Sequence, residues 1–109
     1  MEHVIIDFEK YRTPGAKVFI GRDRGATVRT ESKVDELASQ HERITIRIPK
    51  DIRSINPSFL EEFFYHLIPL LGKDKFLKKF NFINADRYKI EDDLNEAIDR
   101  ILRKENALA

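Results

Sequence analysis

The sequence predicts a single α/β domain over 1–109, in which a mixed four-stranded sheet carries helices mainly on one face. Isoleucines alternate strictly with polar residues over 43–48, which is typical of a strand with one buried face. A helical pattern over 59–71 separates into an apolar and a polar half. Strand-like and helix-like segments follow one another in the order β-β-α-β-α-β-α, which is typical of folds with crossover connections.

The composition excludes several classes of protein. Hydrophobic residues make up 41% of the chain and aromatic residues 10%, so the chain can build a core and is not disordered. It has no cysteine, which excludes disulfides, cysteine-ligated zinc and thiol catalysis. The 20 basic and 19 acidic residues nearly balance, which weighs against a general nucleic-acid or membrane binder. Without a membrane-length apolar run or a signal peptide, we expect a cytoplasmic protein.

The first part of the chain predicts two strands and a helix. Segment 4–8 is short, β-branched and apolar on both faces of the pleat, which favours a central strand. A Pro-Gly turn at 14–15 leads to a second strand at 17–20, so we expect a hairpin between the two strands. After a loop at 21–25, a weakly apolar arc predicts a helix over 26–40.

The alternating strand sets the orientation of the sheet. Its polar members, Arg43, Thr45 and Arg47, would not be tolerated on a face covered by helices. We therefore expect the helices on the other face. The residues predicted to be buried together there are Ile44, Ile46, Ile48, Phe63, Phe64 and Leu67.

The next helix is the main core helix. Asn56 is a favourable cap and Pro57 suits the first helical position. Pro69 weakens the last turn and Gly72 ends the helix. A short helical turn at 74–79, a strand at 80–83 and a final amphipathic helix over 89–104 complete the chain.

Candidate catalytic chemistry is sparse. His3, His41 and His66 have no metal-ligand spacing. Glu61 and Glu62 are adjacent on a helix and point about 100° apart, so they cannot act together as acid and base on one site. We therefore expect neither an enzyme nor a metal or cofactor site.

Basic residues gather between positions 10 and 29. This basic 10–29 patch consists of Lys10, Arg12, Lys17, Arg22, Arg24 and Arg29. The only acid within it is Asp23. A solvated loop is the simplest interpretation. The alternative is an anion site formed by Arg22, Arg24 and Arg29 beside a helix N-terminus, where arginine favours phosphate or carboxylate.

Ser58 follows the proline that opens the core helix. A phosphate at that position would meet unpaired backbone N–H groups and the positive end of the helix dipole. A serine in the first turn of a helix is also, more simply, a good local hydrogen-bonding residue.

Three groups of residues carry a resemblance to a known family. They are Gly21-Arg22 with Gly25 and Val28-Arg29, then Ile52 with 55–64, and then 80–86. Over 18–102 the sequence resembles the STAS-like family of uncharacterised bacterial proteins, which is related to the STAS domain of anti-sigma-factor antagonists. The resemblance implies a four-stranded sheet with helices on one side.

The resemblance also implies a regulatory signalling module that binds other proteins. Ser58 stands where the antagonists carry a phosphorylated serine, although their Asp-Ser-Ser-Gly signature is replaced here by 55–59. A histidine-kinase-type ATPase is the partner class that the resemblance implies. The partner surface would lie at the start of the core helix, with Asn56, Glu61 and Glu62 at its rim.

A second hypothesis is nucleic-acid or nucleotide binding through the basic 10–29 patch. Aromatic residues interleaved with the cations would favour it, but only Tyr11 and Phe19 lie in this stretch. Binding to single-stranded DNA at two salt concentrations separates the hypotheses, because phosphate contacts make affinity steeply salt-dependent.

Overall fold

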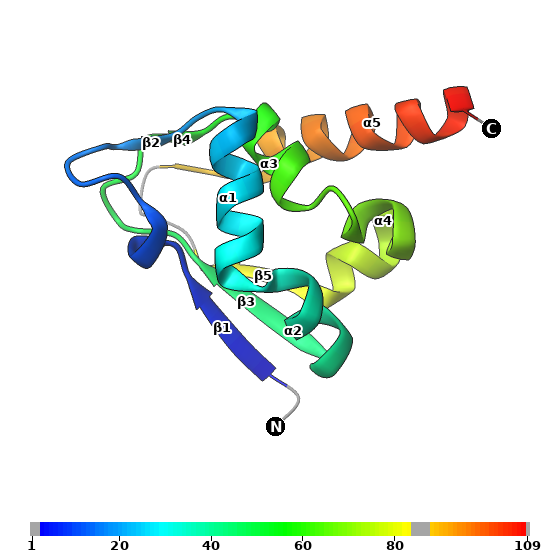
Figure 1. Cartoon of the computed structure of the whole chain (residues 1–109), viewed down its shortest axis with the longest axis horizontal. Coiled ribbons are helices and arrows are strands. Elements are labelled where there is room, and N and C mark those ends of the chain that lie inside the picture. Colours follow the sequence, from blue (N-terminus) through cyan, green and yellow to red (C-terminus); the bar gives the residue numbers. More distant parts are fainter. Residues whose placement is uncertain (1–2, 84–87, 109) are drawn as a thin grey trace.

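Three parallel strands form the main sheet (Figure 1). The computed structural model describes residues 3–83 and 88–108. The strands are β1 (His3–Asp7), β3 (Arg43–Arg47) and β5 (Phe80–Ile83). β3 lies in the centre and pairs in parallel with both neighbours. The fold is therefore α/β with parallel strands.

The remaining two strands form a separate small sheet. β2 (Val18–Phe19) pairs in parallel with β4 (Ser54–Ile55). The predicted mixed four-stranded sheet is therefore wrong, and so is the predicted hairpin between the first two strands. A 3-10 turn, η1 (Phe8–Tyr11), follows β1 directly and buries Phe8, so the chain leaves the main sheet before β2 begins.

The first strand lies at an edge of the main sheet and not in its centre. Its apolar appearance on both faces misled the sequence prediction, because Ile5 lies on the open face and is 47% exposed. Ile6 points to the other face and is buried.

The described residues also form five helices: α1 (Arg22–Ser32), α2 (Val34–Gln40), α3 (Pro57–Phe63), α4 (Leu67–Lys79) and α5 (Glu91–Leu108). Figure 1 shows α1 to α4 on one side of the main sheet. In β3, Ile44 and Ile46 are buried, whereas Arg43 and Arg47 on the opposite face are exposed. This arrangement agrees with helices on one face, whereas Thr45, predicted to lie on the open face with the two arginines, is only 1% exposed.

Two predicted helices are each divided in two. Lys33 adopts a left-handed conformation with φ 57° and separates α1 from α2. The core helix breaks after Phe63, where a turn leads to α4. Gly72 has a φ of 77° and interrupts α4, close to where the sequence predicted a helix end. The predicted loop at 21–25 is also corrected, since α1 already begins at Arg22.

The core is rich in phenylalanine. The ring of Phe63 lies 5.2 Å from that of Phe8 and 4.8 Å from that of Phe64, measured between centroids. Phe64 in turn packs edge-on against Phe76 and Phe80. All six residues predicted to be buried together are buried: Ile44, Ile46, Ile48, Phe63, Phe64 and Leu67.

The final helix follows its predicted amphipathic pattern and reaches further than predicted, to Leu108. The stripe buried beneath it consists of Ile90, Leu94, Ala97, Ile98 and Ile101. Within the part of the chain that the structure describes, no helix combines the length and apolarity needed to cross a membrane.

Tyr88 anchors the start of α5. Its buried hydroxyl contacts the Ile55 carbonyl oxygen at 3.2 Å and the Asp93 carboxylate at 2.7 Å. We expect Tyr88→Phe to lower the free energy of unfolding by about 1 kcal/mol at neutral pH, because these hydrogen bonds are lost. Urea unfolding of both proteins measures the difference.

The same variant has a pH signature. Burial, reinforced by Asp93, raises the pKa of Tyr88 above its usual 10.0. The unfolded chain therefore loses the phenol proton first, and the stability contributed by Tyr88 is lost as pH rises above about 10. The stability that Tyr88→Phe loses relative to the unchanged protein should therefore be smaller at about pH 11 than at pH 7. A loss that grows over this range would contradict a raised pKa for Tyr88 in the folded protein.

Candidate partner-binding groove

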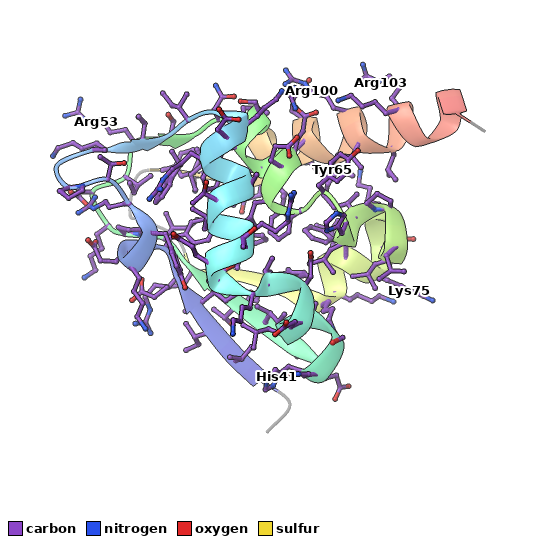
Figure 2. All side chains as sticks on the ribbon, viewed as in Figure 1. His41, Arg53, Tyr65, Lys75, Arg100 and Arg103 are labelled. Carbon is purple, nitrogen blue, oxygen red and sulfur yellow. The ribbon has the colours of Figure 1, made fainter. Side chains whose placement is uncertain are left out.

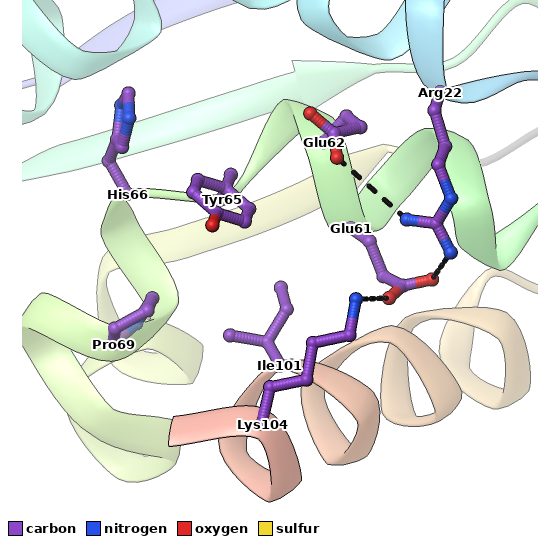
Figure 3. A pocket seen from close by; sticks show the side chains of 8 residues that line it. All are labelled: Arg22, Glu61, Glu62, Tyr65, His66, Pro69, Ile101 and Lys104. Carbon is purple, nitrogen blue, oxygen red and sulfur yellow. Dashed lines mark hydrogen bonds and ion pairs between the residues drawn. The ribbon is translucent and has the colours of Figure 1, made fainter. Parts of the chain in front are cut away.

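A groove of about 320 Å³ lies between α3, the start of α4 and α5 (Figure 3). It is lined by Arg22, Glu61, Glu62, Tyr65, His66, Pro69, Ile101 and Lys104. One part of this lining is apolar or aromatic, and the other part carries both signs of charge. We call it the α3 groove.

Glu61 is the electrostatic centre of the α3 groove. Its side chain is buried, and one carboxylate oxygen accepts hydrogen bonds from Arg22 and Arg100, each at 3.2 Å. Lys104 Nζ lies 3.7 Å from the other oxygen, Oε1. These contacts tie α3 to both α1 and α5.

The burial of Glu61 corrects the expected location of this residue. The sequence placed it at the rim of a surface, but it is only 1% exposed. The rim of the α3 groove is formed instead by the cations around Glu61, since Arg22 and Lys104 are 49% and 63% exposed in their side chains.

Glu62 has a different role from its neighbour. Arg29 donates a hydrogen bond to the Glu62 backbone carbonyl and lies 3.6 Å from its carboxylate. The Arg29 guanidinium also lies 5.9 Å from the centre of the Tyr65 ring, within the range of a cation–π contact. Arg22 approaches the Glu62 carboxylate at 3.8 Å. Glu62 is thus held in place at the edge of the α3 groove.

The arginines of the proposed anion site are distributed between two places. Arg22 and Arg29 meet at Glu62, whereas Arg24 donates to the Tyr11 carbonyl oxygen. Arg12 pairs with Asp51 at 2.8 Å. Four of the six cations in the basic 10–29 patch therefore already have intramolecular partners, and anion binding by Arg22, Arg24 and Arg29 stays a prediction.

Ser58 lies in the first turn of α3 and is partly exposed. Its hydroxyl donates to Asn56 Oδ1 at 2.7 Å, and the same oxygen accepts the Ser58 backbone N–H at 2.9 Å. Asn56 caps the helix in the way that its residue type predicts. This geometry fixes the hydroxyl close to the surface.

The sequence did not reveal the other residues of the α3 groove. Tyr65 and His66 fell on the polar half of an unbroken helix, which predicted only solvent exposure. The turn between α3 and α4 places both in the groove lining, and His66 Nδ1 lies 2.8 Å from Asp35 of α2. One sequence pattern could have indicated the charged part of the groove: Arg100 and Lys104 are four residues apart and therefore lie on one face of α5.

Among the described residues, no group of three or more His, Asp or Glu side chains is arranged to hold a metal ion. Comparisons with protein-family models, curated proteins and solved structures find no match to this chain.

Proposed function

We propose that the chain is a regulatory protein-interaction module of the STAS-like type and not an enzyme. It binds a partner protein, of the histidine-kinase-type ATPase class, through a surface that runs from the start of α3 to the α3 groove. The observation that carries this proposal is the position of Ser58, which precedes Glu62 by four residues. Residues at that spacing share one face of a helix, so the serine lies on the same face of α3 as a residue that lines the groove.

The α3 groove has the composition of a protein-binding surface. Tyr65 is 49% exposed and stands beside Pro69 and Ile101. Tyrosine is enriched at protein interfaces because it buries a large area and loses little entropy. The basic side chains around the groove already form ion pairs with Glu61 and Glu62, so a partner would bind a largely preorganised surface.

Ser58 offers a means of regulation on this surface. Phosphorylation adds about −1.5 to −2 charges. The helix N-terminus favours that charge, whereas Glu62 on the same face opposes it. The fold should tolerate the modification, whereas a desolvated interface should not.

We expect Ser58→Asp to leave stability within about 0.5 kcal/mol of Ser58→Ala, because the favourable and unfavourable charge effects nearly cancel. We also expect it to abolish partner binding, since a new charge in a desolvated interface costs several kcal/mol. Thermal unfolding tests the first expectation. Affinity capture from a lysate of the native host, with quantitative mass spectrometry, tests the second.

The Ser58→Ala variant is the matched control for this experiment. A histidine-kinase-type ATPase should be enriched by the unchanged protein and by Ser58→Ala, but not by Ser58→Asp. If the unchanged protein, Ser58→Ala and Ser58→Asp all capture the same proteins, the partner surface lies elsewhere. Unfolding of Ser58→Asp would show instead that Ser58 has a structural role.

A further inference from the structure

A second hollow lies away from the α3 groove, at the end of the main sheet where the strands finish. It has a volume of about 520 Å³ and is lined by Lys17, Lys50, Asp51, Ile52, Arg53, Tyr88 and Lys89. In Figure 2, Arg53 stands at the left of the view, away from Tyr65 of the α3 groove. We call it the basic hollow.

The topology brings the walls of the basic hollow together. Lys17 belongs to the segment after β1, 50–53 to the segment after β3, and Lys89 to the segment after β5. Because these three strands are parallel, their carboxyl ends meet at one edge of the sheet. The basic hollow therefore lies beyond the carboxyl ends of the main sheet.

Four cations line the basic hollow. Lys17, Lys50, Arg53 and Lys89 are exposed, and their side chains form no ion pair or hydrogen bond within the described part of the chain. Among the described residues of the lining, the one acid is Asp51. Arg12 binds it at 2.8 Å and, together with the charge of Lys17, lowers the pKa of that carboxyl. The hollow thus concentrates positive charge in a chain whose net charge is only +1.

The floor of the basic hollow is fixed. Ile52 and Tyr88 are 2% and 8% exposed, and the Tyr88 hydroxyl is held by the Ile55 carbonyl and by Asp93. The backbone N–H of Arg53 donates to the Lys17 carbonyl oxygen at 2.7 Å, which joins two of the walls. The backbone that carries the cations is therefore well supported.

We propose that the basic hollow binds a small ligand that carries two or more phosphoryl groups. Lysine ammonium groups bind phosphate as point charges, and arginine binds it through paired N–H donors. A single-stranded nucleic acid is disfavoured because binding it requires exposed aromatic rings for stacking. Among the described residues of the lining, Tyr88 is the only aromatic one, and it is buried.

The test is isothermal titration calorimetry of the full chain with three probes: inorganic tripolyphosphate, a nucleoside triphosphate and a single-stranded oligothymidylate. The double variant Lys50→Gln/Arg53→Gln removes two cations from the hollow. Lys75→Gln/Lys78→Gln removes the same charge from the exposed surface of α4 and serves as the matched control. We expect the hollow variant to weaken tripolyphosphate binding by about tenfold or more and the control variant to leave it unchanged.

The probes separate the sources of the phosphoryl groups. Binding of both tripolyphosphate and the nucleoside triphosphate supports recognition through phosphate alone. Binding of the nucleoside triphosphate alone, lost in the hollow variant, supports the site and assigns it to nucleotides. The proposal is overturned if no probe binds, if the oligothymidylate binds more tightly than tripolyphosphate, or if both double variants weaken binding equally. Because this hollow shares no residue with the α3 groove, the result is independent of the proposed partner binding.

Discussion

Replacing Phe63 by alanine is expected to lower the free energy of unfolding by about 3–5 kcal/mol. Phe63 is completely buried, and its ring packs against those of Phe8, Phe59 and Phe64. The truncation removes this apolar contact and leaves a cavity between η1 and α3 that rigid neighbouring rings cannot fill. Equilibrium urea unfolding measures the loss.

Leu77→Ala is the control for this prediction. Leu77 is 40% exposed on α4, so its truncation should change stability by no more than about 0.5 kcal/mol. A loss below about 1 kcal/mol for Phe63→Ala would mean that the residue does not belong to the core.

The second large effect is expected at Gly25, where alanine should lower the free energy of unfolding by about 2–3 kcal/mol. A Cβ atom at Gly25 would lie 2.4 Å from the Phe59 carbonyl oxygen and 3.0 Å from Glu62 Cβ. Since a backbone carbonyl cannot rotate away, α1 and α3 would have to separate. The overpacking should outweigh the gain of about 1 kcal/mol that alanine brings to a helix interior.

Differential scanning calorimetry distinguishes this packing role from simple helix propensity. Glu31→Ala, at an exposed position of the same helix, should leave the melting temperature nearly unchanged. An ordinary glycine in a helix would raise the melting temperature when replaced by alanine. Such a rise for Gly25→Ala would show that α1 and α3 are not in close contact at this point.

Local sequence patterns predicted the helices and strands better than they predicted which strands pair and which helices pack together. The alternation at β3 and the amphipathic stripe of α5 depend on side-chain periodicity alone, and both were predicted correctly. The pairing of β1 with β3 depends on contacts between residues about 40 positions apart, and no short pattern encodes it. The buried contact of Gly25 with α3 is similar, because a glycine between a strand and a helix equally suggests a loop.

The break after Phe63 is explained by Pro69, which lies in the first turn of α4. In an unbroken helix the Pro69 nitrogen, which has no N–H, would face the Tyr65 carbonyl. Phe64 ends α3 and is buried among Phe76, Phe80 and Phe82, so the residue at the break belongs to the core. The α3 groove depends on that break, and for this reason the sequence indicated Ser58 and Glu62 but not Tyr65. The burial of Glu61 likewise depends on cations contributed by α1 and α5.

Photo-crosslinking in the native host tests the proposed partner surface most directly. A photoreactive phenylalanine analogue at Tyr65 probes the α3 groove, and the same analogue at Ile5 probes the open face of the main sheet. The two positions are equally accessible, at 49% and 47% exposure. We predict that Tyr65, but not Ile5, yields a crosslink to a histidine-kinase-type ATPase. The same products from both positions, or none from Tyr65, would contradict partner binding through the surface of α3.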